Sequence, residues 1–428
     1  MYLIHNLLTI NINIGLLYRQ LVNELNKMSD LYSQPFQMEP LLIDATRLAH
    51  QELLGLAQQL SEASAALDAR LSPLTAQGMS ALVMGMNCYY SNLLEGHQTL
   101  PIDIDAAIVH LKQNKGHRDL KNLAAAHIET DRWARACDLQ SMPLTEFIKN
   151  AHATFYDNLP HESLLLVDGS SVVPGEVRQQ NQNVIVGQHV PPSAESLPAF
   201  MARYESVYGQ RLATATRGGI HKLDAVMASF IAHHRLVWIH PFLDGNGRVA
   251  RITLDAMLRA CGVNSAGLWS MSRGFAKTND TYKQSLAGAD SSRMGDLDGR
   301  GNLSEKRLVE FCRYAMTTAI DQANFMAKLF DVKHLIERVD TYFQLVRRDL
   351  RPESARLYIH AILTGEFERM AASLVTGLPE RTARKTLAAL VAEGFLVSDT
   401  PRSKVRAGFP VLAMGSIFPN LFPLGMIK

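Results

Sequence analysis

The sequence predicts a mainly α-helical protein that ends in a small domain of three helices and a β-hairpin. In residues 44–70, apolar residues recur at spacings of three and four, as they do on one face of an amphipathic helix. Similar helical patterns fill most of the chain. Beyond Pro352, three shorter helical patterns (354–363, 366–374 and 380–393) precede two extended runs. This is the order of a winged helix-turn-helix domain.

The composition is that of an ordinary soluble protein with two or three domains. The 428 residues are 47% hydrophobic and 20% charged, and the net charge of +2 argues neither for nor against a nucleic-acid partner. The four cysteines lie far apart without a CxxC pair, which favours reduced thiols in a cytoplasmic protein over disulfides or a zinc site. No apolar run is long enough to span a membrane, so we expect no membrane partner.

Changes of pattern divide the chain into five parts. Residues 1–27 are apolar but lack the basic start and cleavage site of a signal peptide, so we interpret them as a disordered or wrongly assigned extension. Residues 28–110 are expected to form an N-terminal helical region, and residues 111–330 the helical core. Residues 331–351 are expected to form a linker helix, and residues 352–428 the winged-helix domain.

The segment His240-Pro-Phe-Leu-Asp-Gly-Asn-Gly-Arg-Val-Ala-Arg251 contains a turn that is suited to binding an anion. Gly245, Asn246 and Gly247 carry little side-chain bulk and stand just before a helical pattern. Backbone N–H groups at the start of a helix converge on anions, and phosphate is the commonest of these. The turn therefore predicts a phosphate site.

Charged residues in the same segment extend this prediction. Arg248 and Arg251 are three residues apart, so they share a helix face and point back toward the turn, where they would complete a polyphosphate site. Asp244 is a lone carboxylate at its edge, suited to Mg²⁺ that phosphate oxygens also hold. His240 titrates near neutrality in its unperturbed state, as a general base for a hydroxyl must.

These residues resemble the signature of the Fic family, HPFx(D/E)GNGRxxR, at every fixed position. Each residue alone has an ordinary structural explanation, but their order and spacing together leave little room for coincidence. Upstream, Ala232 and His233 match the family's pattern, although Leu236 replaces the usual aromatic residue. We expect His233 to be a packing residue or one that supports the site from behind, and not a catalytic one. Downstream, Tyr282 and residues 287–290 resemble the part that lines the adenine and ribose.

The resemblance implies a protein adenylyltransferase with the Fic helical fold. AMP would move from ATP to a Ser, Thr or Tyr hydroxyl of a target protein, or of the chain itself, and pyrophosphate would leave. His240 would deprotonate the hydroxyl, and Asp244 would hold Mg²⁺. The residues expected to bind ATP are Gly245, Asn246, Gly247, Arg248, Arg251 and Tyr282. The resemblance also leaves open a homodimer.

Residues 167–198 interrupt the helical pattern with proline, glycine and short β-branched runs, which predict a small β-hairpin. Residues 174–192 resemble the target-binding flap of the Fic family. Its extended piece, which could pair with a target segment by strand addition, comprises Val184, Ile185, Val186 and Gly187.

The segment Ser91-Asn-Leu-Leu-Glu-Gly96 resembles the (S/T)xxxE(G/N) inhibitory motif of the same family. Ser91 and Glu95 are four residues apart and share a helix face. The resemblance implies that Glu95 pairs with Arg251 and hinders binding of the γ-phosphate. It also leaves open a second role, in which Glu95 helps to remove AMP from the target. The alternative is a plain helix end, capped by Gly96.

The C-terminal part leaves two functions open. Residues 380–387 have the pattern of a recognition helix, and Arg402, Lys404 and Arg406 that of a basic wing. DNA binding and protein contact are equal alternatives, because the local excess of basic residues is small. The rival interpretation of the whole chain is a transcriptional regulator in which the core only senses nucleotide.

Overall fold

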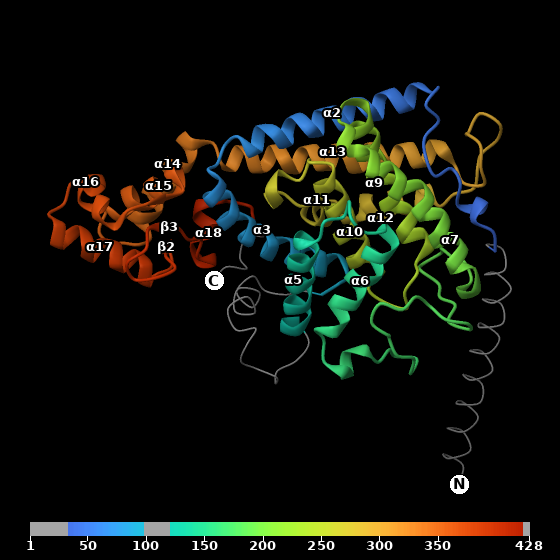
Figure 1. Ribbon diagram of the computed structural model, residues 1–428, viewed down its shortest axis with the longest axis horizontal. Helices are drawn as coiled ribbons and strands as arrows, with labels where there is room; N and C mark the ends of the chain where they lie inside the picture. Colours follow the sequence, from blue (N-terminus) through green and yellow to red (C-terminus); the bar gives the residue numbers. More distant parts are fainter. Residues whose placement is uncertain (1–32, 98–119, 423–428) are drawn as a thin grey trace, which may run out of the picture.

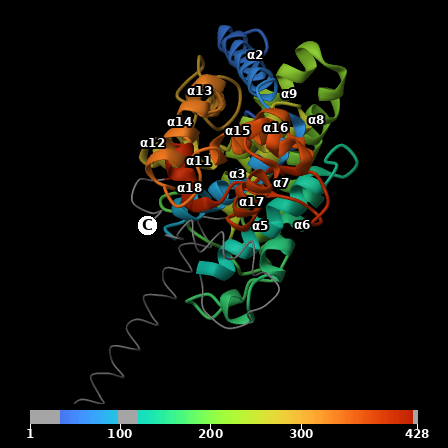
Figure 2. The same cartoon turned by 90° about the vertical axis from the view of Figure 1, so that its left-hand side faces the viewer.

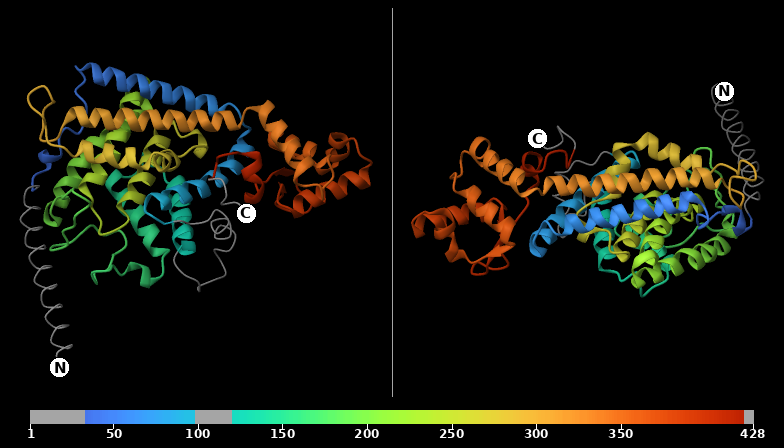
Figure 3. Two further views of the ribbon diagram at one scale, coloured as in Figure 1. Left: turned by 180° about the vertical axis from the view of Figure 1, so that it is seen from behind. Right: turned by 90° about the horizontal axis from the view of Figure 1, so that it is seen from above.

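The computed structural model describes residues 33–97 and 120–422, so the expected extension at residues 1–27 lies outside it. The described part is mainly helical, as predicted, with one small sheet near its C-terminal end. No helix within the described ranges combines the length and the apolar character that a membrane crossing requires. The predicted helix at residues 44–70 is present as α2 (Leu48–Asp68). It lies alongside α13 (Glu305–Leu329) on one edge of the protein (Figures 1 and 3).

Two helices at the centre of the core carry the ends of the predicted anion site. Helix α9 (Gly219–Ile239) is buried on every face from Ala225 to Leu236, and α10 (Asn246–Ala260) packs against it. Helix α6 (Leu144–Asp157) packs against α10 and against α5 (Leu120–Ala136). The remaining core helices are α7 (Leu197–Tyr204), α8 (Gln210–Thr214), α11 (Met271–Lys277) and α12 (Asn279–Ala289).

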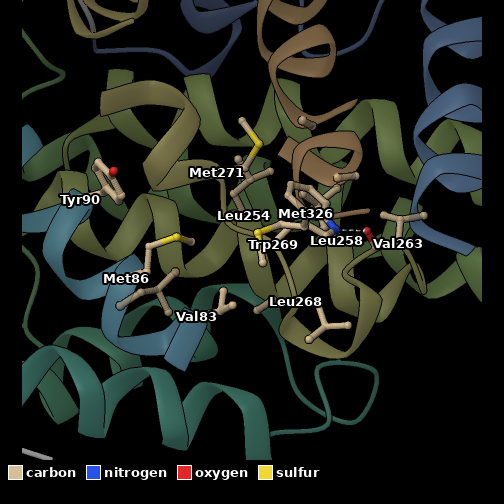
Figure 4. Packing of buried hydrophobic residues seen from close by; sticks show 14 of the residues in the cluster. Val83, Met86, Tyr90, Leu254, Leu258, Val263, Leu268, Trp269, Met271 and Met326 are labelled. Carbon is tan, nitrogen blue, oxygen red and sulfur yellow. Dashed lines mark hydrogen bonds between the residues drawn. The ribbon is translucent and has the colours of Figure 1, made fainter. Parts of the chain in front are cut away.

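Helix α3 (Pro73–Leu94) carries the predicted inhibitory residues at its C-terminal end. Its middle turns pack against the core through Val83 and Met86, next to the buried Trp269 (Figure 4). The indole Nε1 of Trp269 donates a hydrogen bond to the carbonyl of Val263 at 3.2 Å, so this large side chain is buried with its polar group satisfied. The position of α3 is thus fixed by the same core that holds α10.

The C-terminal unit, which we define as residues 332–422, contains five α-helices, one short 3-10 helix (Arg369–Ala371) and an antiparallel sheet of order β1-β3-β2. Figure 2 views this end of the molecule, with α15, α16 and α17 toward the reader. Its elements are α14 (Val332–Leu345), α15 (Ser354–Thr364), β1 (Glu366–Phe367), α16 (Ala372–Thr376), α17 (Glu380–Ala392), β2 (Leu396–Val397), β3 (Val405–Ala407) and α18 (Val411–Ile417).

Two sequence predictions for this unit need correction. The helix predicted at residues 366–374 begins instead with strand β1, because Glu366 and Phe367 pair with β3, forty residues further along the chain. Helix α18, which sequence patterns did not predict, follows β3. Helix α14 lies in the predicted linker, but it packs against α15 and α18 and so belongs to this unit.

The flap region forms less regular structure than the sequence predicts. The expected hairpin is reduced to one bridge, in which Val186 and His189 exchange backbone hydrogen bonds of 2.9 and 3.0 Å. Gly187 stands at the turn with a φ of 64°, a conformation that favours glycine. The apolar side chains of Ile185 and Val186, which precede this turn, are exposed.

The C-terminal unit packs along α3. The hydroxyl of Thr75 donates to the carbonyl of Ile362 at 2.8 Å, and the hydroxyl of Tyr90 donates to that of Leu421 at 3.3 Å. Between them, a Cβ on Gly78 would come within 2.9 Å of the Phe409 ring, so the absence of a side chain allows the close approach. Helix α3, which leads to the predicted inhibitory residue Glu95, therefore packs on two sides, against the core and against the C-terminal unit.

Replacing Phe395 with alanine should destabilise the C-terminal unit by about 3–5 kcal/mol. This buried ring contacts Phe343 and Tyr358, with centroids 5.1 and 5.3 Å away, so its loss leaves a cavity. The measurement is hydrogen exchange of the amides of α14, α15 and α17 by mass spectrometry. Met370→Ala serves as the control and should change exchange little, because that side chain is 87% exposed. Equal effects of the two substitutions would contradict the prediction.

Candidate active site

The loop between α9 and α10 begins with His240 in a left-handed conformation (φ 49°, ψ 61°). A residue with a side chain adopts this conformation at a cost, so the surrounding contacts must hold it in place. Asn246 supplies two of them: its Oδ1 accepts from the amide of Phe242 at 2.9 Å, and its Nδ2 donates to the carbonyl of Phe242 at 2.8 Å. The oxygen of the side-chain amide and one N–H of Nδ2 therefore shape the loop, and Nδ2 carries a second N–H. The phosphate contact expected of Asn246 stays a prediction, beside this role in the loop.

Both glycines of the turn are required by close neighbours. A Cβ on Gly245, whose φ is 78°, would lie 2.9 Å from the ring of Tyr156. A Cβ on Gly247 would overlap Oε1 of Glu95. Helix α10 starts at Asn246 without a side-chain cap, and the first N–H groups of a helix have no intrahelical partner. These amides are the ones that the sequence predicts to form the phosphate cradle.

Asp244 is exposed, and two residues of α6 hold it. The Tyr156 hydroxyl donates to its Oδ2 at 2.8 Å, and Nε2 of His152 lies 3.3 Å from its carbonyl. The amide of Gly175 donates to Nδ1 of His152 at 2.9 Å, so the ring proton is on Nε2 and points at Asp244. Phe242 stacks on the His152 ring at 3.9 Å. Sequence reasoning missed both residues of α6; their only signal is two aromatic polar side chains four residues apart.

The carboxylate of Asp244 fits a metal that has further ligands from outside the protein. Within residues 33–97 and 120–422, no group of three or more His, Cys, Asp or Glu side chains could hold a metal ion. Mg²⁺ often keeps one or two protein carboxylates and takes its other ligands from water and phosphate. A single exposed aspartate beside a phosphate cradle is consistent with that pattern.

The pKa of the His240 imidazole is lower than the sequence predicts. Burial, together with the positive charge of Arg178 and the nearby His189, lowers its pKa to about 4. The expected titration near neutrality is therefore wrong for this conformation. The imidazole is neutral at pH 7, which is the form of the ring that can accept a proton.

Arg248 and Arg251 lie on one face of α10, as predicted, but their surroundings differ. Arg248 is buried, and its Nε and Nη2 find no hydrogen-bond partner in the part of the chain that the structure describes. The ring of Phe155 lies 5.2 Å from its guanidinium carbon, and the charge of Glu95 is near enough to interact with it. Buried N–H groups without hydrogen-bond partners are costly, so this position is suited to receive a further anion.

Arg251 is paired instead, with the two residues of the predicted inhibitory motif. Its Nη2 donates to Oε1 of Glu95 at 2.7 Å, and its Nε and Nη2 donate to Oγ of Ser91 at 3.1 and 3.0 Å. Arg251 is 3% exposed and Glu95 31%. Burial acts to raise the pKa of Glu95, but the charges of Arg251 and Arg248 outweigh it, so the pKa is lowered and the carboxylate is ionised.

The end of α3 fixes the direction of Glu95. The amide of His97 donates to the carbonyl of Asn92 at 2.9 Å, and that of Gly96 to the carbonyl of Leu93 at 3.0 Å. With Gly96 at a φ of 82°, these two bonds form a Schellman motif, which confirms the predicted glycine cap. Glu95 is the C-cap residue that directly follows α3, so the helix end and the turn at Gly96 together set the direction of its side chain.

Comparison with known proteins places this site in a family. Residues 143–258 match the model of the Fic/DOC family. The chain contains a Fic domain. A "Protein adenylyltransferase Fic" from Drosophila willistoni is 33% identical over 115 residues, covering 27% of this chain and 21% of that protein. A protein of the same name from Nematostella vectensis is 28% identical over 174 residues, covering 41% and 37%. These matches span well under half of each relative's length.

A solved structure of a Fic family protein from Desulfovibrio desulfuricans G20 aligns with 86% of this chain and 98% of its own, at 18% identity and a TM-score of 0.49. The matched family range in this chain covers the flap and the whole loop from His240 to Arg251. Ser91, Glu95 and Tyr282 lie outside that range.

Tyr282, which lies beyond the matched range, is a buried residue of α12. Its side chain is 4% exposed, stacks on Phe275 at 4.1 Å, and its hydroxyl lies 2.9 Å from Nε2 of His233. The Nδ1 of His233 faces the carbonyl of Ala250 at 3.1 Å and so carries the ring proton, which leaves Nε2 to accept from Tyr282. In this conformation Tyr282 packs inside the core. The ATP contact expected of Tyr282 stays a prediction, and His233 packs in the core as expected.

Replacing Glu95 with glutamine should lower the free energy of unfolding of the core by about 1–2 kcal/mol at pH 7, because Arg251 loses its charged partner. The folded-state pKa of Glu95 is lowered, so its stabilising charge is present above the ordinary value of 4.5 and is lost as pH falls through the folded value. The two proteins should therefore converge in stability below pH 4.5. Urea unfolding, followed by fluorescence of the three core tryptophans, measures the difference.

Glu52→Gln is the matched control for this comparison. Glu52 also pairs with an arginine, Arg313, but both side chains are nearly half exposed. Such surface pairs contribute less than about 1 kcal/mol. A Glu95→Gln protein that is no less stable than Glu52→Gln at pH 7 would mean that the Arg251 pair adds nothing to the fold.

Proposed function

We propose that this protein transfers AMP from ATP to a Ser, Thr or Tyr hydroxyl of a target protein, and that Glu95 restrains this activity. The observation that carries the proposal is the loop from His240 to Arg251. It places a neutral imidazole, an amide cradle and two buried guanidiniums together. The names of the similar proteins from Drosophila willistoni and Nematostella vectensis, both adenylyltransferases, support it.

The residues of the loop supply the groups that in-line transfer requires. The target hydroxyl gives its proton to His240, its oxygen forms a bond to the α-phosphorus, and the bond between that phosphorus and pyrophosphate breaks. Arg248 and the first amides of α10 bind the phosphates and stabilise the charge that develops on them. Asp244 would hold Mg²⁺, which neutralises phosphate charge when it is bound. The self-modification implied by the sequence would use the same chemistry on a hydroxyl of this chain.

Glu95 opposes this reaction in two physical ways. Its carboxylate places a negative charge beside the cradle, in contact with the space above Gly247, and it neutralises Arg251. A γ-phosphate would meet repulsion there and would lack its second cation. Removing the carboxylate should therefore activate the enzyme. The same carboxylate could position a water to remove AMP from a modified target, which remains a second role for this residue.

The exposed flap fits a target segment by the chemistry of its backbone. Ile185 and Val186 expose apolar side chains, and Val184 is half-buried. The ring of His189 bonds through Nε2 to the carbonyl of Trp238 at 2.7 Å, which ties the turn at Gly187 to the end of α9. A peptide that adds to this extended piece would lie close to His240.

The alternative of a DNA-binding regulator finds less support. Of the six basic residues between residues 376 and 406, three are paired with carboxylates: Arg384 with Glu380, Lys404 with Glu366, and Arg406 with Asp399. Paired cations attract phosphate weakly. Nothing in the described ranges specifically favours a homodimer. The enzyme is therefore the function that the site supports best.

In the test of this function, Glu95→Gly should raise incorporation of AMP into the protein or an added target at least about tenfold, because Arg251 becomes free. Adding His240→Ala should abolish incorporation while ATP binding persists, because the cradle and both arginines remain. Mass spectrometry of the protein incubated with ATP and Mg²⁺ detects the modification. A pre-modified target should lose AMP only with Glu95 present.

Glu393→Gly is the matched control. Glu393 is the C-cap residue of α17, as Glu95 is of α3, and each precedes a glycine with positive φ. Glu393 also pairs with an arginine, Arg347, at 3.1 Å. This substitution should leave transfer unchanged. The inhibitory role of Glu95 is refuted if the two glycine variants label equally, and the proposed function itself fails if Glu95→Gly with ATP and Mg²⁺ transfers no AMP to any protein.

The pH dependence of transfer gives a separate test of His240. A base with a pKa of about 4 stays unprotonated across the range from pH 8 to 5, so in the Glu95→Gly protein kcat should be flat there and fall only as pH approaches 4. ATP binding measured at each pH separates the base from effects on the nucleotide. A half-maximal rate near pH 6.5 would show that His240 keeps an unperturbed pKa in the working state.

A further inference from the structure

Arg178 is a buried arginine whose hydrogen bonds go to backbone carbonyls. Its side chain is 2% exposed, and among the described residues it forms no ion pair with a carboxylate. Nε donates to the carbonyl of His240 at 2.9 Å, Nη2 to that of Pro192 at 2.9 Å, and Nη1 to that of Gln182 at 3.1 Å. The backbone amide of Arg178 also donates to the carbonyl of Pro241, at 2.8 Å. One residue thus grips two consecutive carbonyls at His240 and Pro241.

The end of α9 explains why a cation is stable at this buried position. The last carbonyls of a helix have no intrahelical partner, and the helix dipole places partial negative charge on them. Helix α9 ends at Ile239, directly before the carbonyl that Arg178 binds. Burial lowers the pKa of Arg178 to about 10, so it remains charged at neutral pH. The guanidinium therefore serves as the cap of α9 in place of a carboxylate partner.

The same guanidinium binds the backbone on both sides of residues 183–191, which are the middle part of the flap. Gln182 and Pro192 bracket residues 183–191, which contain the exposed extended piece and its turn. A planar fork can hold three carbonyls in fixed directions at once. A single side chain therefore joins the backbone at Gln182 and Pro192 to that of His240, which lies about fifty residues further along the sequence.

We propose that Arg178 is a positioning residue for the transfer, which holds the base His240 and the target-binding flap in one fixed arrangement. The inference rests on the proposed function, since it assigns to Arg178 the alignment of the target hydroxyl with the base. His240 has a strained backbone that needs support, and Arg178 binds its carbonyl. The positive charge of Arg178 also contributes, after burial, to the lowered pKa of His240.

Arg178→Lys tests the arrangement because lysine keeps the charge but has one nitrogen in place of the fork. A single ammonium cannot reach His240 and both ends of the flap together. In the Glu95→Gly protein, kcat should fall at least about tenfold, since small misplacements of reacting groups are costly. The KM for ATP should stay within about twofold, because Arg248, Arg251 and the cradle on α10 are unchanged.

Arg178→Met tests the charge. Removing a cation beside His240 makes protonation of the ring easier, so the acid limb of the kcat profile should move to higher pH. NMR titration of the His240 imidazole in the same variant should show the same rise in its pKa. A purely structural role would lower stability without moving either quantity. Where the methionine variant does not fold, the lysine variant supplies the kinetic test.

Arg235→Lys is the matched control, on helix α9, whose C-terminal end Arg178 binds. Arg235 is also fully buried without a carboxylate ion pair in the described ranges, and its Nη2 donates to the carbonyl of Pro40 at 2.9 Å. The Arg235→Lys substitution should lower the melting temperature but leave kcat and the acid limb of its pH profile unchanged.

The inference is overturned if Arg178→Lys keeps full kcat, or if Arg235→Lys produces the same kinetic loss. Absence of transfer in the Glu95→Gly parent would refute the proposed function alone. In that case an unchanged His240 titration in Arg178→Met would still overturn the inference.

Discussion

The buried charge of Arg251 is the constraint on which the arrangement of this site depends. A guanidinium that is 3% exposed needs partners, and in this structure they come from α3, more than 150 residues away in the sequence. To supply them, α3 must end at the cradle with Glu95 directed inward. The Schellman motif at Gly96 sets that direction, and packing of the core and the C-terminal unit sets the position of the helix. The contact between Glu95 and Arg251 is therefore stabilised by much of the fold.

The sequence predicted the parts of the site that are contiguous or that belong to a known pattern. The spacing of Arg248 and Arg251, the cradle, and the pair between Glu95 and Arg251 were all accessible from it. His152, Tyr156 and Arg178 were not, because each acts on the loop from a segment about 60 to 90 residues away. Such contacts depend on tertiary packing, which no local spacing records. The low pKa of His240 was missed for the same reason, since burial and Arg178 cause it.

The fold shows the same limit. Helix α2 was predictable because its apolar period of 3.6 residues reports a single buried face. Residues 366–367 read as the start of a helix, yet they form strand β1 because β3 offers hydrogen bonds across forty residues. A strand of two residues has too little length to show an alternating pattern, so only its partner reveals it.

The unequal partners of the two arginines suggest how inhibition would act in the proposed enzyme. Glu95 occupies Arg251, but Arg248 keeps two buried nitrogens without hydrogen-bond partners among the described residues, next to the free amides of α10. One end of the phosphate site therefore remains open while the other is neutralised. A nucleotide could still gain the energy of the open end, since a buried unpaired cation favours any anion that reaches it. What it would lack is the second cation that fixes its last phosphate, and with it the in-line direction of the leaving group. Because transfer depends on that alignment, a carboxylate at Glu95 can suppress the reaction without closing the site.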